Sequence, residues 1–154
     1  MQKAQQILKP EYMGFWTEKD GYHHQPFFMI VEGRGTKIKD GAEDWKMLNE
    51  HTFSGTIEDS LGTAEFYGEQ TDDMISFSKT YKKPPHTGLN FVHIGPIRYN
   101  GRKVDGKRYE GRYVLKGKVG DKTTEYAGTF LIEPFVDSPT INLIFEQMQE
   151  KNKR

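Results

Sequence analysis

The chain has no cysteine among its 154 residues and no long apolar run. Disulfide bonds and thiolate metal sites are therefore excluded. The longest apolar stretch is Phe27 to Val31, far shorter than the roughly 20 residues that a membrane-spanning helix needs. The opening segment 1–10 lacks the apolar stretch of a secretory signal peptide. We therefore expect a soluble, cytoplasmic protein that does not associate with membranes.

Net charge is also absent, because 22 basic side chains balance 22 acidic ones. No overall field therefore attracts a polyanion such as nucleic acid. The charges are uneven along the chain, with an acidic excess from Glu32 to Asp73 and a basic excess from Arg98 to Lys122. In a meander these stretches are expected on opposite walls. They form either solvated outer faces or complementary surfaces for self-association or an acidic partner.

Sequence motifs of catalysis are missing as well. The chain has no glycine-rich phosphate loop opening a helix, no Gly-x-Ser-x-Gly and no His-Glu-x-x-His. The adjacent His23 and His24 project to opposite sides of an extended chain, which is poor geometry for a metal ion. We therefore expect no metal site and no cofactor.

What the chain does have is an aromatic residue two positions before a glycine, at several places. These pairs include Phe53 and Gly55, Phe66 and Gly68, Tyr99 and Gly101, Tyr109 and Gly111, and Tyr126 and Gly128. Residues i and i+2 of a strand share a face, so each ring lies beside a gap where the backbone can bend or a neighbouring ring can cover it. Small, strongly coiled sheets are built in this way, and the pairs predict a closed or nearly closed antiparallel barrel.

Hairpin signals divide the middle of the chain into short strand-like segments. Turn dipeptides such as Asp20-Gly21 and Asp105-Gly106 alternate with runs rich in aromatic and β-branched residues. No run between them has the pattern of a crossover helix, which argues against parallel βαβ units. We predict a single all-β domain over 1–154, with an up-and-down antiparallel barrel of eight to ten strands over 11–134.

Helical segments are expected at both ends of the chain. Residues 4–8 place apolar side chains on one helical face before a proline, which predicts a short plug over 1–10. Ser138 and Pro139 are typical of a helix start, so we predict a helix over 138–152. Its apolar stripe consists of Ile141, Ile144, Phe145 and Met148. We expect this stripe to complete the core against the barrel's outside or an open end; the alternative is a homodimer surface.

The residues Gly14-Phe15-Trp16-Thr17 resemble the Gly-x-Trp opening shared by lipocalins and avidin-like proteins, the calycin group of up-and-down barrels. The order of a short helical segment, this motif, glycine-punctuated strands and a C-terminal helix is similar to that of the group over nearly the whole chain. The resemblance implies that Trp16 closes one end of the barrel and that the other end is open to a small molecule. The chain departs from the group in lacking a clear Thr-Asp-Tyr turn. With only Trp16 and Trp45, it also lacks a tryptophan cage for biotin.

Alternation along the expected strands assigns a tyrosine-rich set of residues to the inside of the barrel, which is more typical of a lined cavity than of a dry core. Lys79 shares its strand face with three hydrophobic residues. A buried ammonium needs an anion, because burying it unpaired costs several kcal/mol. A ligand carboxylate would serve. Otherwise Lys79 reaches solvent at one end or pairs with a glutamate such as Glu65 or Glu69.

His51 comes two residues before Phe53, and His93 follows Leu89 and Phe91 at a spacing of two. Both histidines are therefore expected to face inward at the mouth of the barrel. The candidate ligand-binding residues are Lys79, Tyr81, Tyr109, Tyr113, Tyr126, Phe53, Phe66, His51 and His93. No catalytic residue is assigned.

The residues leave three functions open. The first is non-catalytic binding of a small amphipathic or aromatic molecule in a barrel cavity, with an anionic group facing Lys79. The second is a barrel enzyme of isomerase or lyase type that uses His51 or His93 as a base. The third is an interaction or structural module whose barrel is filled by its own aromatic residues, with nucleic-acid binding through the basic hairpins as a minor variant.

Overall fold

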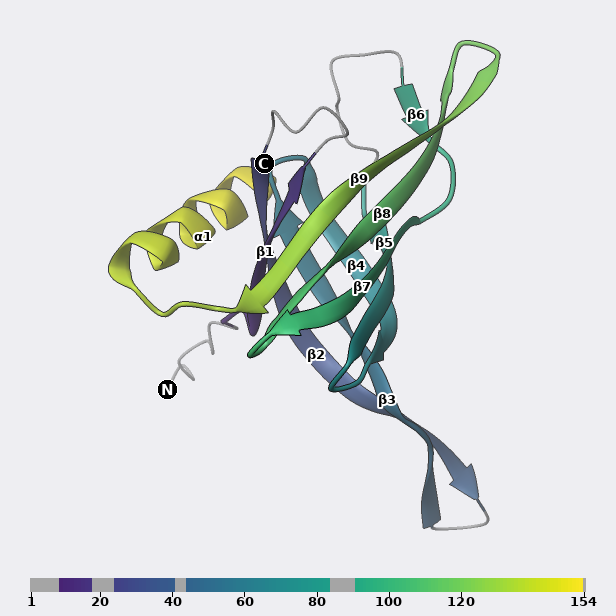
Figure 1. Ribbon diagram of the computed structural model, residues 1–154, viewed down its shortest axis with the longest axis vertical. Coiled ribbons are helices and arrows are strands. Elements are labelled where there is room, and N and C mark those ends of the chain that lie inside the picture. The colour runs from purple at the N-terminus through teal and green to yellow at the C-terminus, as the bar shows by residue number, and fades with distance from the viewer. Residues whose placement is uncertain (1–8, 18–23, 41–43, 84–90, 154) are drawn as a thin grey trace, which may run out of the picture.

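The computed structural model describes residues 9–17, 24–40, 44–83 and 91–153. Within these residues the chain forms nine strands and one helix (Figure 1). The strands are β1 (Tyr12–Thr17), β2 (His24–Asp40), β3 (Asp44–Asp59), β4 (Gly62–Gln70), β5 (Met74–Tyr81), β6 (Phe91–His93), β7 (Ile97–Asp105), β8 (Arg108–Val119) and β9 (Lys122–Pro134); the helix is α1 (Pro139–Asn152). Of the plug expected over 1–10, only Lys9 and Pro10 lie within the described residues, and neither is helical.

Eight of the strands close into an antiparallel meander barrel. They pair around the ring in the order β1-β2-β3-β4-β5-β7-β8-β9, and the pairing of β1 with β9 closes it. The short β6 lies outside the ring and pairs with the far end of β8, from Phe91 opposite Val119 to His93 opposite Gly117. The prediction of an all-β up-and-down barrel with eight to ten strands is confirmed.

Glycines allow neighbouring strands and rings to approach closely, as the aromatic–glycine pairs predict. Gly101 on β7 lies opposite Gly111 on β8. A Cβ added at Gly111 would stand 1.9 Å from the backbone oxygen of Asn100, so the two strands have no room for a side chain there. A Cβ at Gly128 would stand 2.3 Å from the hydroxyl oxygen of Tyr113, whose ring covers that glycine. The barrel can therefore bend tightly and still be filled.

Aromatic rings fill the middle of the barrel. The buried rings there are those of Phe27, Phe53, Phe66, Phe77, Tyr99 and Phe130. Phe77 and Tyr99 stack face to face, with centroids 4.6 Å apart and planes 8° apart, and the other rings meet edge to face or tilted. Burial of rings of this size supplies most of the stabilisation that a small barrel can obtain.

The helix α1 packs against the outside of the barrel beside β1 and β2 (Figure 1). Ser138 caps its first turn, accepting a hydrogen bond from the backbone N–H of Ile141 at 3.2 Å. Phe145 is buried from the helix side against Met13 and Phe28 of the outer wall. The predicted helix over 138–152 is therefore confirmed. Ile141, Phe145 and Met148 of its apolar stripe complete a second core outside the barrel, whereas Ile144 is 39% exposed.

Replacing Gly111 by alanine should destabilise the fold by about 2–3 kcal/mol, because the added methyl group must push β7 and β8 apart. Equilibrium unfolding in urea measures the change. The matched control is Gly33→Ala, whose added Cβ meets the movable side-chain oxygen of Ser54 at 3.2 Å. Equal losses for the two variants would contradict the close approach at Gly111.

Candidate functional site

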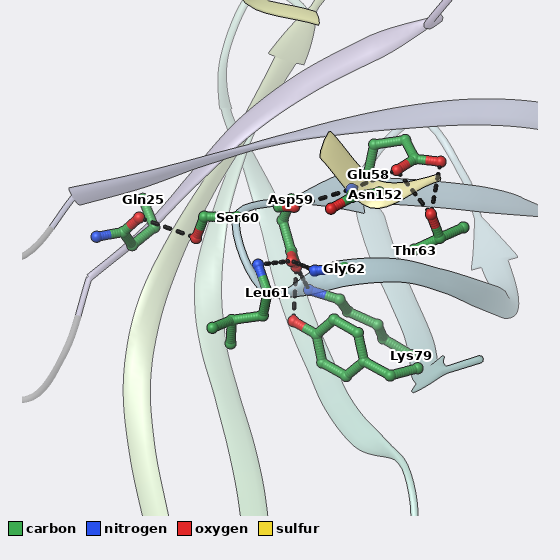
Figure 2. Close-up of polar contacts among 10 residues, drawn as sticks. Gln25, Glu58, Asp59, Ser60, Leu61, Gly62, Thr63, Lys79 and Asn152 are labelled. Atoms are coloured by element: carbon green, nitrogen blue, oxygen red, sulfur yellow. Dashed lines mark hydrogen bonds and ion pairs between the residues drawn. The ribbon is translucent and has the colours of Figure 1, made fainter. Parts of the chain in front are cut away.

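A buried ion pair lies at the end of the barrel where β3 and β5 finish (Figure 2). Lys79 projects from β5 into the barrel, and its ammonium donates to Oδ2 of Asp59. The two side chains are 2% and 0% exposed. Because burying either charge alone costs several kcal/mol, each side chain makes the burial of the other tolerable.

Asp59 is held by the turn between β3 and β4. Its Oδ1 accepts hydrogen bonds from the backbone N–H groups of Leu61 and Gly62, at 2.8 and 3.2 Å. Its Oδ2 accepts from the hydroxyl of Tyr81 at 2.6 Å, besides the ammonium of Lys79. An aspartate that bonds the backbone two and three residues ahead is typical of a tight turn. Both carboxylate oxygens are therefore occupied by donors of the protein itself.

Aromatic rings surround the Lys79 ammonium. Its Nζ lies 4.7 Å from the ring centroid of Tyr81, 5.8 Å from that of Phe27 and 5.9 Å from that of Tyr99. A cation at such distances is attracted by the negative face of each ring. The rings and the carboxylate together stabilise the charged form of Lys79 inside the barrel.

The pKa values in this cluster follow from burial and from the neighbouring groups. Burial by itself would lower the pKa of Lys79, but Tyr99, Asp59 and Tyr81 raise it well above its ordinary value of 10.5. Burial raises the pKa of Tyr81 and of Tyr99, and the ammonium only partly opposes this. Burial lowers the pKa of His93, and Lys79 lowers it further. At neutral pH Lys79 is therefore charged, while the two tyrosines and His93 are neutral.

A second buried carboxylate, that of Glu58, ties the end of α1 to the same end of the barrel. Nδ2 of Asn152, the last residue of α1, donates to Oε2 of Glu58 at 2.6 Å and to the backbone oxygen of Asp59 at 3.1 Å (Figure 2). The hydroxyl oxygen of Thr63 lies 2.9 and 2.8 Å from the two carboxylate oxygens of Glu58. The helix and the β3–β4 turn are thus fastened to each other next to the ion pair.

A separate polar network lies at the opposite end of the barrel. Arg34 donates to Gln70 at 2.9 Å, and Gln70 donates to the hydroxyl of Tyr12 at 2.9 Å. The hydroxyl of Tyr109 donates to the backbone oxygen of Thr71 at 2.7 Å. Both ends of the barrel are therefore bridged by side chains of the wall.

The structure brings part of the predicted site together. Lys79, Tyr81 and His93 share the Asp59 end, where the rings of Tyr81 and His93 have centroids 5.8 Å apart. Tyr113 is buried near this end, with its ring edge-on to that of Trp16 at 6.1 Å. Trp16 is partly buried and packs against the core, at the same end. Phe53 and Phe66 belong to the rings that fill the middle of the barrel.

The remaining predicted residues lie elsewhere. Tyr109 belongs to the opposite end of the barrel. His51 also lies toward that end, with its side chain 52% exposed and Nε2 3.6 Å from Oε1 of Glu50. Tyr126 is 48% exposed, because it lies on the part of β9 that projects beyond the barrel with β8 (Figure 1). The nine predicted residues therefore do not form one pocket.

Sequence reasoning missed Asp59 and Tyr99. The anion that Lys79 requires is Asp59, and not Glu65 or Glu69, which are both exposed. Asp59 carries a signal in the alternation, because it is the last residue of β3 and follows the buried Ile57 at a spacing of two on the inward face. Tyr99 carries a visible signal, since it belongs to an aromatic–glycine pair. The role of Lys79 as an anchor for a ligand stays a prediction. Its ammonium is already paired with the carboxylate of Asp59.

A groove of about 1020 Å³ runs across the outer wall, over β1, β9, β8, β7 and the start of β5. Its apolar side chains include Phe15, Leu131, Met74 and Val104. Its polar side chains include Asn100, Arg102, Glu110, Arg112 and Thr129. These polar residues face outward, because their strand neighbours Tyr99, Tyr113 and Phe130 are buried inside the barrel. The size matches the upper end of known small-molecule sites.

The groove lies on the basic side of the molecule. The strand β8 is four strands from β3 in either direction around the ring, so the basic stretch is opposite the acidic one, as the sequence predicts. Arg102 and Arg112 form no ion pair with any of the described residues. The carboxylate of Glu110 lies 3.2 Å from the guanidinium of Arg108. The groove therefore offers two guanidinium groups to a bound molecule.

Comparisons of the chain with protein-family models, curated proteins and solved structures found no match. The closed eight-strand barrel is compatible with the calycin resemblance, and membership of that group stays a prediction. In the part of the chain that the structure describes, no helix is long and apolar enough to cross a membrane. Among the same residues, no group of three or more histidine or acidic side chains is placed to hold a metal ion.

Replacing Lys79 by methionine should destabilise the protein by about 3–5 kcal/mol, because the carboxylate of Asp59 stays buried without its cation. Urea unfolding at pH 7 measures the loss. Lys82→Met is the control, since Lys82 is exposed just beyond β5 and should change stability by less than about 0.5 kcal/mol. A similarly small change for Lys79→Met would contradict the importance of the pair.

The free energy of unfolding should decline as the pH rises above about 10. The folded-state pKa values of Lys79, Tyr81 and Tyr99 are raised, so the unfolded chain releases these protons first and is favoured at alkaline pH. Urea unfolding between pH 8 and pH 11.5 checks this. Tyr81→Phe removes one of the three groups and should make the decline shallower. An identical decline in the variant would show that Tyr81 does not contribute.

Proposed function

We propose that the protein is a non-catalytic binding barrel for a small amphipathic molecule, which binds in the groove on the outer wall. The observation that supports this most strongly is the contrast between a barrel middle filled by the protein's own rings and a groove of about 1020 Å³ outside it. The sequence alone favours a ligand inside the barrel. We place it outside because six buried rings occupy the middle of the barrel.

The composition of the groove supports binding of an amphipathic molecule. Phe15 and Leu131 are adjacent across β1 and β9, and Val104, which also lines the groove, is 50% exposed. Apolar surface of this kind gains free energy when a ligand removes it from water, at about 25 cal/mol per Å². The neighbouring arginine and amide side chains give the ligand an orientation.

The groove lining offers no general base that is free to act. It contains no histidine, and its carboxylate, that of Glu110, is paired with Arg108. His51 and His93 lie near opposite ends of the barrel, so they do not combine into one site. Binding without chemistry is therefore the function that this surface supports best.

The neutral dye Nile red tests the groove by fluorescence titration. Wild-type protein should bind it saturably, and Leu131→Ser should weaken binding about five- to tenfold, because part of a leucine's burial energy is lost. The matched control is Leu143→Ser. Leu143 lines a separate hollow of about 410 Å³ along α1, so this variant should bind the dye as wild type does. If Leu143→Ser weakened dye binding more than Leu131→Ser, the dye would bind along α1 and the proposal for the groove would be wrong.

An interaction module is the second candidate, because the filled interior equally suits a barrel that acts through its surface. In that case the groove receives a segment of another protein. Absence of saturable dye binding by the wild type would contradict the small-molecule proposal and favour this candidate.

A further inference from the structure

We infer that the groove holds the anionic head of its ligand, a carboxylate, sulfate or phosphate group, on Arg112, Asn100 and Arg102, with the ligand's apolar tail over Leu131 and Phe15. This inference rests on the proposed function, because it assigns a chemical class to the molecule bound in the same groove. The ligand is a single-chain amphipathic anion.

The strand register places the donors of the groove in one row. Asn100 on β7 lies opposite Arg112 on β8, and Arg112 lies opposite Thr129 on β9. Directly opposite residues of antiparallel strands have Cβ atoms roughly 5 Å apart, so their side chains can reach a common ligand group. A guanidinium, an amide and a hydroxyl therefore stand side by side on the outer wall.

A hydrogen bond orients the amide in this row. The hydroxyl of Ser76 on β5 donates to Oδ1 of Asn100 at 2.8 Å. Because the amide oxygen is used by Ser76, Nδ2 is left to donate on the side of Arg112. The amide is thereby prepared to bind an acceptor such as an oxyanion.

The charges of the groove favour an anion over a cation or a zwitterion. Arg102 lies one row further along β7 than Asn100, and its guanidinium adds a second positive charge near Arg112. Glu110 lines the groove between them, but Arg108 engages its carboxylate. Guanidinium groups bind carboxylate, sulfate and phosphate oxygens in a bidentate way, which orients the ligand as well as holding it.

The next row sets the direction of the tail. It runs from Met74 through Arg102 and Glu110 to Leu131 and Phe15, as the pairings of β5, β7, β8, β9 and β1 show. Leu131 and Phe15 thus lie together at the β9–β1 side, beside the row that holds Arg112, whereas Met74 lies at the β5 side of the same row. A chain that starts at the donors can extend over Leu131 and Phe15 without leaving the groove.

Displacement of bound Nile red by decanoate and by decanol tests the inference. The two compounds have the same tail, so their ratio of affinities reports the head group alone. Wild-type protein should bind decanoate about tenfold more tightly than decanol, and Arg112→Gln should abolish most of this preference while leaving decanol unchanged. Arg98→Gln is the matched control, because Arg98 lies on the same face of β7 but outside the groove lining, and it should keep the preference.

The outcomes separate this inference from the proposed function. If decanol and decanoate displace the dye equally in wild type, the groove binds amphipathic molecules but the head-group assignment is wrong. If neither displaces it, the groove binds the dye but no single-chain amphipathic molecule, and the inference is wrong. The proposed function fails separately, when wild-type protein does not bind Nile red saturably. Inorganic phosphate at the concentration of decanoate and matched ionic strength provides a further arm. Displacement by phosphate as strong as by decanoate would overturn the role of the tail, whereas weak displacement by phosphate supports an amphipathic anion.

Discussion

The ion pair between Lys79 and Asp59 is the constraint on which the rest of the barrel depends. It joins the last residues of β5 to the end of β3, and both charges are almost wholly removed from water. Such a pair is tolerated only when every lone pair and proton has a partner, and here the turn backbone, Tyr81 and the surrounding rings supply those partners. Since Glu58 and Asn152 continue the network to the end of α1, the helix, the turn and the barrel wall are held in one arrangement.

Filling the barrel with rings is the reason for proposing a binding surface on the outside. Tight strand approach at Gly101 and Gly111 lets Phe77, Tyr99 and Phe130 meet in the centre, and the same bending shapes the wall across which the outer groove runs. A lipocalin-like resemblance favours an interior ligand, whereas this packing favours an exterior one. The physical reason is that close-packed rings gain more from one another than from an open cavity that water would have to fill.

The groove owes its chemistry to two arginines that the protein leaves unpaired within the described residues. Arg102 and Arg112 stand on the basic wall, four strands away from the acidic wall, so no carboxylate of that wall can neutralise them. The guanidinium groups on β7 and β8 and the apolar side chains of Leu131 and Phe15 on β9 and β1 make a surface with a charged part and an apolar part. That combination is what an amphipathic anion requires, and a surface made only of charged or only of apolar side chains would not orient it.

The sequence by itself determined the local features of the fold. The aromatic–glycine pairs and hairpin dipeptides predict the barrel, and Ser138-Pro139 with its apolar stripe predicts the helix, because backbone freedom, turn geometry and side-chain periodicity are properties of neighbouring residues. It also singled out Lys79 as a cation on an otherwise apolar strand face, which needs an anion if that face is turned inward. Only the tertiary structure decided that Asp59, 20 positions away, is that anion, because the pairing of β3, β4 and β5 brings the ends of β3 and β5 together. The tertiary structure also decided that Tyr126 lies beyond the barrel and that Asn100, Arg112 and Thr129 form one row. The first result depends on strand length and the second on strand register, and both are set by pairing between segments that are distant in the sequence.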